Sequence, residues 1–176
     1  MTRRIVLTGP ECSGKTTLAV GLAGRLHAPW LPEASRRYAE EVRRELTVED
    51  VEPIARRAML VEDAALATDP PLLLLDTDLV STVLYARHYY GACPAWVEQA
   101  ARDRRGELYL LCVPDLPWAA DGVRDRPAQR WELFSLFERT LLEFGCATVN
   151  VSGSGAARER AALTAVSALT AAAASP

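Results

Sequence analysis

The sequence predicts an α/β fold in which about five parallel strands form one sheet with helices on both faces, a three-layer arrangement. Short apolar runs alternate with longer segments of helical periodicity, the order expected when helices connect parallel strands. The run at 72–75 is continuously apolar and ends at Asp76, as expected for a strand buried on both faces. With 176 residues, 49% of them hydrophobic and 24% charged, residues 1–176 are predicted to form a single domain.

Five segments carry the strand pattern. The first leads into a glycine-containing loop, and the second is weakened by its two prolines. The expected strands are 4–8, 28–32, 71–75, 108–113 and 147–151. Connections between parallel strands of one sheet are expected to be right-handed crossovers.

The segments between these strands are predicted to be helical. The expected helices are 15–26, 34–46, 48–68, 79–90, 94–104, 128–144 and 156–174. The stretch 114–127 is long and irregular for a strand–helix connection, so it is a candidate lid.

Net charge and cysteine content argue against several classes of function. The formal net charge is −3 and the Arg pairs alternate with acids, so general binding to nucleic acid or anionic membranes is not expected. The 4 cysteines form no closely spaced pair and only 2 histidines accompany them, so neither a zinc site nor a disulfide framework is expected. No apolar run suits a signal peptide or a membrane span, so the protein is predicted to be cytoplasmic.

Residues 9–16, GPECSGKT, match the pattern G-x-x-x-x-G-K-[ST] between the first expected strand and the first expected helix. The glycines let backbone N–H groups converge on phosphate oxygens, and the helix N-terminus adds partial positive charge. Lys15 is expected to reach the β- and γ-phosphates, and Thr16 to bind Mg²⁺. The residues expected to bind ATP are Gly9, Glu11, Cys12, Ser13, Gly14, Lys15, Thr16 and Thr17. A tight turn without a ligand is the alternative.

Lys15 is the only lysine among the 20 Lys and Arg residues. An Arg side chain is planar and forked, whereas a phosphate loop needs a compact point charge on a thin stem. A chain that otherwise uses Arg is expected to keep Lys where Arg does not fit. This usage supports a phosphate site at the loop.

Asp76 and Asp78 follow the apolar run at 72–75. In a parallel α/β sheet the ligand crevice lies outside the carboxyl ends of the strands. Asp76 is therefore a candidate catalytic residue that holds Mg²⁺, directly or through water, in the manner of a Walker B aspartate. Asp78 is a candidate contact to a substrate hydroxyl, and equally a candidate N-cap of the next helix.

Glu33 follows the second expected strand and is expected at the same edge of the sheet. It is a candidate to accept the proton of an attacking hydroxyl or to hydrogen-bond the substrate. The alternative is a helix-start acid that complements the helix dipole. Arg36 lies one helical turn later and is expected to face the same way, toward the substrate.

The candidate lid contains the sequence PWAADGVRDRP. Arginines on a closing lid neutralise charge on a transferring phosphoryl group, so Arg124 and Arg126 are candidate ATP contacts and Arg124 a candidate catalytic residue. Trp118 and Asp121 are candidate substrate contacts. The alternative for Trp118 is that it only anchors the loop to the core.

Together these segments resemble the ribosylnicotinamide kinase (nicotinamide riboside kinase) domain of the NadR family, a P-loop domain of the AAA-type ATPase-like class. The resemblance covers most of the chain and rests on GPECSGKTTL, PEASRRYA, LLLLDTDLVSTVLYARHYYG and PDLPWAADGVR. It implies transfer of the γ-phosphate of ATP to the 5′-hydroxyl of nicotinamide riboside, giving nicotinamide mononucleotide. The implied ATP–Mg²⁺ residues are Lys15, Thr16 and Asp76, and the implied substrate or lid residues are Glu33, Asp78 and Arg124.

The chain departs from the family pattern beside Glu33. Family members tend to carry an aromatic residue just before this glutamate, whereas Pro32 stands there in this chain. The candidates for a replacement ring are Tyr85, Tyr89, Tyr90 and Trp118. Two alternatives stay open: a P-loop kinase for another nucleoside, nucleotide or vitamin precursor, and a nucleotide-binding ATPase or switch that acts through a protein partner.

Overall fold

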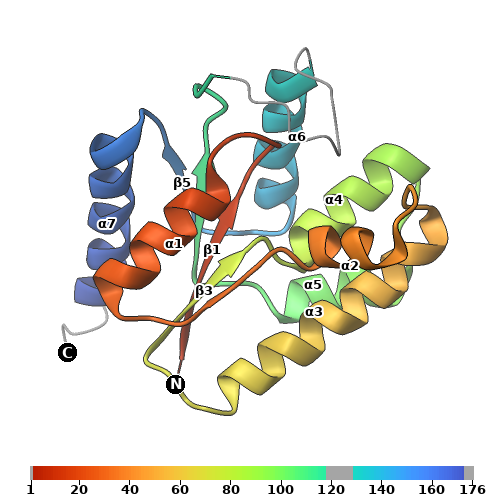
Figure 1. Cartoon of the computed structure of the whole chain (residues 1–176), viewed down its shortest axis with the longest axis horizontal. Helices are drawn as coiled ribbons and strands as arrows, with labels where there is room; N and C mark the ends of the chain where they lie inside the picture. Colours follow the sequence, from red (N-terminus) through yellow and green to blue (C-terminus); the bar gives the residue numbers. More distant parts are fainter. Residues whose placement is uncertain (1, 118–128, 173–176) are drawn as a thin grey trace.

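A parallel five-stranded sheet lies at the centre of the computed structural model, which describes residues 2–117 and 129–172 (Figure 1). The strands are β1 (Arg3–Thr8), β2 (Trp30–Leu31), β3 (Leu72–Asp76), β4 (Leu108–Cys112) and β5 (Thr148–Val151). Their order is β2-β3-β1-β4-β5, and every neighbouring pair is parallel. The predicted α/β fold is confirmed. The strand that precedes the glycine loop, β1, lies in the middle of the sheet.

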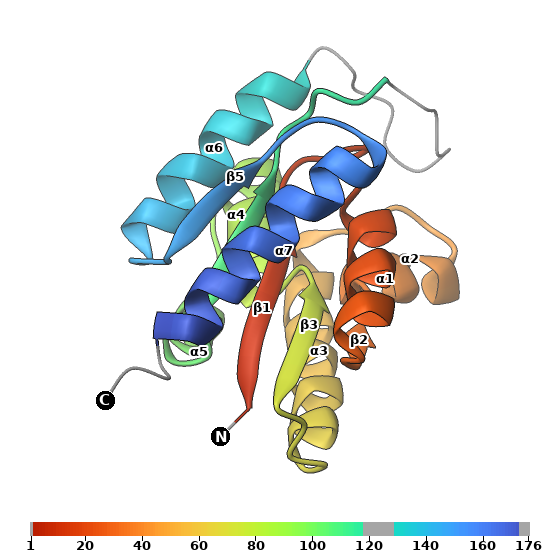
Figure 2. The ribbon, with the colours of Figure 1, turned by 90° about the vertical axis from the view of Figure 1, so that its left-hand side faces the viewer.

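Helices pack on both faces of this sheet. They are α1 (Lys15–Leu26), α2 (Ala34–Val42), α3 (Val51–Leu66), α4 (Leu79–Tyr90), α5 (Ala95–Asp103), α6 (Arg130–Glu143) and α7 (Gly155–Ala172), with a 3₁₀ turn, η1 (Val48–Asp50), before α3. One face is covered by α1 and α7 and the other by α3 to α6, so the fold has three layers (Figures 1 and 2). None of the described helices is long and apolar enough to cross a membrane.

Alternation along the strands builds two cores, one on each face of the sheet. In β1, Val6 packs into the same core as Leu73 and Leu75 of β3, whereas Ile5 and Leu7 pack into the core beneath α1 and α7. All five side chains are buried. Because both faces are covered, the strands read as continuous apolar runs rather than as an alternation of polar and apolar residues.

The edge strand β2 is shorter than predicted, with only Trp30 and Leu31 in the ladder instead of residues 28–32. Proline has no N–H to donate to a neighbouring strand, and Pro29 and Pro32 flank these two residues. The Pro29 carbonyl still accepts a hydrogen bond from the N–H of Leu74. The strand is therefore limited to the two residues between the prolines, which have backbone N–H groups to donate.

The helix predicted at 34–46 ends early, at Val42, because Arg43 adopts the left-handed conformation with φ 52°. The chain then turns, and Arg44 donates two hydrogen bonds to the carboxylate of Asp50, at 2.6 and 2.8 Å. Asp50 is buried and also accepts from the N–H of Thr47, which closes a capping box at η1. This short-range pairing, between residues 6 apart, closes the turn that separates α2 from α3.

Asp78 begins α4 as its N-cap. One carboxylate oxygen accepts hydrogen bonds from the N–H groups of Val80 and Ser81, and the other accepts one from the hydroxyl of Tyr109 in β4, at 2.5 Å. Burial raises the pKa of Asp78 to about 6, against the lowering effect of these bonds. The capping alternative for Asp78 is therefore observed, and the side chain also ties β3 to β4.

The raised pKa of Asp78 predicts a stability that depends on pH. Since the folded state binds the proton more tightly than the unfolded chain, this contribution is complete below pH ~4 and is lost as pH rises through about 6. Relative to the Asp78→Asn variant, the free energy of unfolding of the wild type should fall by roughly 2 kcal/mol across this range. Denaturant unfolding at several pH values measures this difference.

The Asp78→Ala variant is the matched control, because it removes the cap together with the charge. It should be less stable than Asp78→Asn at every pH by about 1 kcal/mol, since Asn still caps the helix. Parallel pH curves for the wild type and the Asn variant would contradict the buried-carboxylate explanation.

Candidate functional site

The glycine loop at 9–16 runs from the end of β1 to the start of α1 and packs tightly against the end of β4. Gly9 has φ +133°, and a Cβ there would lie 2.8 Å from the carbonyl oxygen of Cys112. Gly14 has φ +78°, and a Cβ there would lie 2.7 Å from a methyl group of Leu116. Both positions therefore favour glycine for backbone conformation, and Gly9 also for space, because its neighbour is backbone.

Lys15 begins α1 and folds back onto the loop. Its ammonium donates to the carbonyl oxygen of Pro10 at 2.9 Å, and the hydroxyl of Ser13 donates to the same oxygen at 2.7 Å. Both side chains are buried. The one lysine of the chain thus places its charge at the loop, beside the N-terminus of a helix, where an anion is favoured.

Asp76, at the end of β3, accepts a hydrogen bond from the hydroxyl of Thr16 at 2.5 Å. Its other oxygen, Oδ1, is buried without a hydrogen-bond partner among the described residues. Burial raises the pKa of Asp76, although the Thr16 hydroxyl and the Lys15 ammonium lower it. A buried carboxylate oxygen without a partner is costly, and a bound cation would satisfy it.

The donor set fits magnesium. A hydroxyl and a carboxylate are hard oxygen ligands, and Mg²⁺ commonly uses one or two protein oxygens and completes its shell with water and phosphate oxygens. Among the described residues no group of three or more His, Cys, Asp or Glu side chains could hold a metal ion by itself. A metal at Thr16 and Asp76 would therefore depend on a phosphate ligand.

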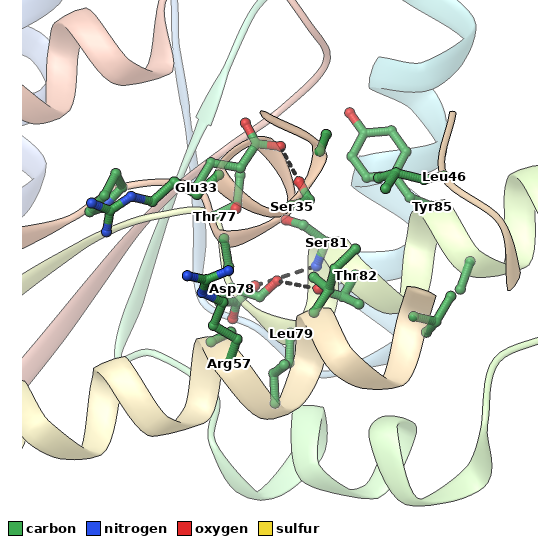
Figure 3. Close-up of a pocket in the computed structure, with 18 of the residues that line it drawn as sticks. Glu33, Ser35, Leu46, Arg57, Thr77, Asp78, Leu79, Ser81, Thr82 and Tyr85 are labelled. Atoms are coloured by element: carbon green, nitrogen blue, oxygen red, sulfur yellow. Dashed lines mark hydrogen bonds between the residues drawn. The ribbon is translucent and has the colours of Figure 1, made fainter. Parts of the chain in front are cut away.

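A cavity of about 480 Å³ opens beside this pair, between α2, α3, α4 and the ends of β2 and β3 (Figure 3). Glu33, Thr77 and Asp78 line it, and Figure 3 shows them with Ser35 near the ends of the two strands. Thr77 has φ +68°, an uncommon conformation for a threonine, at the sharp turn from β3 toward α4. The remaining walls combine aliphatic residues such as Leu46 with charged ones such as Arg57.

Tyr85 of α4 supplies an aromatic wall on another side of the cavity (Figure 3). Its ring stacks on Tyr89 with centroids 5.8 Å apart and meets the ring of Phe137 edge to face at 5.7 Å. Tyr89 and Tyr90 also line the cavity. Of the rings considered in place of the aromatic residue missing at Pro32, the three tyrosines line this cavity, and Tyr85 is braced by two neighbours.

Glu33 lines this cavity, and neighbouring side chains hold its carboxylate. The hydroxyl of Ser35 donates to its Oε1 at 2.6 Å, and Arg36 approaches its other oxygen at 4.0 Å. Glu33 also occupies the N-cap position of α2, but its side chain caps no backbone N–H. Its carboxylate is thus engaged by neighbouring side chains instead of the helix backbone.

The remaining predicted site residues fall into two groups. Glu11 and Cys12 lie in the loop, half-buried, and Thr17 lies in the first turn of α1 with an exposed side chain. The lid residues Trp118, Asp121, Arg124 and Arg126 lie outside the described residues.

Two buried arginines behind the loop were missed by the sequence reasoning. Arg130 donates to the carbonyl oxygen of Cys12 at 3.1 Å, and Arg158 donates to that of Ser13 at 2.8 Å. Both come from C-terminal helices, far along the chain from the loop. Neither residue lies in a motif, and neither stands out in a chain that contains many arginines. No local signal in the sequence could therefore have found them.

Comparison with known proteins agrees with this geometry. Residues 4–160 match the model of a family described as an AAA domain. The trifunctional NAD biosynthesis/regulator proteins NadR of Escherichia coli K12 and Salmonella typhimurium LT2 are each 28% identical to this chain over 154 residues. These matches cover 81% of this chain and 37% of each relative, so the chain spans little more than a third of their length.

Solved structures share the fold. A NadR protein in complex with NR has a TM-score of 0.77 and 26% identity, over 97% of this chain and 52% of that one. A NadR protein in complex with NAD and AMP-PNP has a TM-score of 0.74 at 24% identity, over 97% of this chain and 50% of that one. A thymidylate kinase from Ehrlichia chaffeensis has a TM-score of 0.66 at 14% identity, over 96% and 98% of the two chains. The latter two show the fold alone.

The comparisons confirm the resemblance to NadR that the sequence motifs indicated. The family model covers most of the chain and includes the glycine loop, Asp76 and Arg158. This protein belongs to the AAA domain family, and it is similar to NadR.

Proposed function

We propose that this protein is a P-loop kinase that transfers the γ-phosphate of ATP to the 5′-hydroxyl of a nucleoside-like acceptor, with nicotinamide riboside first. One observation carries the proposal: a cavity of about 480 Å³ is lined by Thr77 and Asp78, which directly follow Asp76 of the Thr16–Asp76 pair, and by Glu33. A switch ATPase needs only the loop. A cavity of ligand size that begins at the residues after Asp76 supports a second, small substrate.

The nucleotide half of the mechanism relies on the loop. Its amides, the N-terminus of α1 and the ammonium of Lys15 would hold the phosphates in line with the acceptor. Thr16 and Asp76 would hold Mg²⁺, which when bound neutralises the charge on the β- and γ-phosphates. Because phosphoryl transfer depends mainly on positioning and charge, a rigid loop is the main requirement on this side.

The acceptor half of the mechanism relies on Glu33. Both oxygens of Asp78 are engaged by the α4 backbone and Tyr109, so Glu33 is better placed to orient the acceptor hydroxyl and to receive its proton. Asp78 would shape the wall and limit where a sugar can lie. Arg124 and Arg126 stay predictions from the sequence for neutralising the transferring phosphoryl group.

Relatives support the choice of the acceptor. The 28% identical relatives are described as NAD biosynthesis proteins, and a NadR protein with this fold has been solved in complex with NR. The tyrosines lining the cavity supply a ring for stacking although Pro32 does not. A kinase acting on another nucleoside or a nucleotide is the second candidate, which the thymidylate kinase fold favours.

An acceptor panel tests the proposal. Purified protein with ATP and Mg²⁺ should phosphorylate nicotinamide riboside with a higher kcat/KM than adenosine, uridine, thymidine or thymidylate, as measured by product chromatography. The Asp76→Ala variant is the negative control. ATP hydrolysis that no acceptor changes would favour the switch alternative and overturn the proposal.

The position of Lys15 in the loop leads us to expect a melting temperature that depends on bound nucleotide. ATP with Mg²⁺ should raise the melting temperature of the wild type through preferential binding to the folded state. Lys15→Ala should lose most of that shift, and so should Lys15→Arg, because the forked guanidinium does not fit a site where the lysine is buried. Arg25→Ala, an exposed basic residue of the same helix, is the matched control, and its shift should equal that of the wild type. An undiminished shift in Lys15→Ala would contradict the assignment of the loop.

Removing the ring of Tyr85 should weaken binding of the acceptor selectively. Replacing its ring by Leu should raise the KM for the acceptor about 10-fold, because stacking on a base contributes roughly 1–3 kcal/mol. The KM for ATP should stay unchanged. Tyr85→Phe keeps the ring and should behave like the wild type, and steady-state kinetics with each substrate varied in turn decide the question. A Leu variant with normal acceptor KM would show that the ring does not contact the acceptor.

A further inference from the structure

Arg158 of α7 joins four parts of the chain behind the phosphate loop. Its guanidinium donates to the carbonyl oxygen of Ser13 at 2.8 Å and to that of Val113, after β4, at 2.9 Å. It also donates to the carboxylate of Asp115 and to the carbonyl oxygen of Gly153, both at 2.7 Å. Only 4% of the residue is exposed. All four bonds come from its two terminal nitrogens.

The partners of Arg158 are themselves tied together. The second carboxylate oxygen of Asp115 accepts the N–H of Gly153 at 2.6 Å, so the turn before α7 closes onto the segment after β4. Burial alone would raise the pKa of Asp115, but the bonds from Gly153 and Arg158 outweigh burial and the pKa is lowered. The guanidinium of Arg158 therefore has a charged partner, Asp115, which is itself held in place by the N–H of Gly153.

Arg130 makes a matching contact on the preceding peptide of the loop. It is also buried, and it donates to the carbonyl oxygens of Cys12 and Leu116, both at 3.1 Å. Two consecutive carbonyl groups of the loop are thus held by arginines from two different helices. On the same side of the loop, Gly9 packs against the backbone of Cys112 at the end of β4.

The direction of these carbonyl groups fixes the direction of the loop's N–H groups. In a planar trans peptide the C=O of one residue and the N–H of the next point in opposite directions. Holding the carbonyls of Cys12 and Ser13 at the rear therefore turns the N–H groups of Ser13 and Gly14 to the front. That is the side on which loop amides of this kind bind phosphate.

We propose that Arg158 is a positioning residue for the nucleotide: it orients the Ser13 peptide so that the loop N–H groups face the phosphates, and Arg130 does the same for the Cys12 peptide. The inference rests on the proposed function. Arg158 touches no reacting atom and acts through the loop. Its loss should weaken nucleotide binding and leave the acceptor cavity, which lies on the opposite face of the sheet beside α2, α3 and α4, unchanged.

The test compares three variants. Arg158→Ala removes the guanidinium, Arg158→Lys keeps the charge but cannot bond four acceptors in a planar fork, and Arg160→Ala removes an exposed arginine from the same helix as a matched control. The dissociation constant for ATP with Mg²⁺ is measured by calorimetry without acceptor, and the KM values for ATP and acceptor are measured separately. Thermal melts set a temperature at which every variant is folded.

Arg158→Ala should weaken ATP binding and raise the KM for ATP by about 10- to 100-fold, the effect of losing hydrogen bonds to a charged group and misplacing the loop. The KM for the acceptor should change less than about 2-fold, Arg158→Lys should be intermediate, and Arg160→Ala should match the wild type. Added guanidinium ion at millimolar concentration should partly restore ATP affinity to Arg158→Ala and should not help Arg160→Ala.

Normal ATP affinity in folded Arg158→Ala would overturn the proposal, and so would an equal rise of the two KM values, which indicates general loosening. If Arg158→Ala does not fold, Arg158→Lys and Asp115→Asn test the proposal instead. Asp115→Asn keeps the guanidinium but removes the charge of the carboxylate that holds it. Both should then show weaker ATP binding with a normal acceptor KM. Since ATP affinity is measured without acceptor, a wild type that binds ATP but phosphorylates no nucleoside would refute the proposed function and leave this test valid.

Discussion

The hydroxyl of Thr16 and the carboxylate of Asp76 meet at 2.5 Å where the central strands β1 and β3 end side by side. The register of the sheet sets Leu7 opposite Asp76, and so places Asp76 beside the end of β1, from which the glycine loop leads into α1. On one side of the pair lies the loop with Lys15, and on the other lies the cavity with Glu33. The geometry of both proposed substrates depends on this contact.

The same place carries the main local costs of the fold. Asp76 keeps a buried oxygen without a partner among the described residues, Thr77 adopts a left-handed conformation, and Gly9 tolerates no side chain. Such costs are typical of a site that is shaped for a ligand rather than for stability alone. They are offset elsewhere, by two apolar cores on the faces of the sheet and by buried arginines that fasten the loop from behind.

Much of this arrangement could be predicted because its causes are local or periodic. The loop pattern requires particular residue types at fixed spacing, and a continuous apolar run ending in an acid places Asp76 at the carboxyl edge of a buried strand. Asp78 shows the boundary of such reasoning. Its position predicted a cap or a substrate contact equally, and the hydroxyl of Tyr109, 31 residues away, engages its second oxygen. The early end of α2 has a nearer cause, since Arg43 adopts a left-handed conformation and Arg44 pairs with Asp50 in a turn that helical periodicity does not contain.

By itself, the sequence determined that a parallel α/β sheet would present a phosphate loop, because strand burial, glycine conformation and the single lysine are properties of neighbouring residues. Only the tertiary structure decided what surrounds that loop. It brought Arg158 to Ser13 across 145 positions, and it placed Tyr85 on the wall of the cavity proposed for the acceptor. Contacts of this kind depend on how the helices pack over the sheet. Packing depends on the shapes of side chains and on their distances in space, and the order of residues along the chain does not reveal those distances.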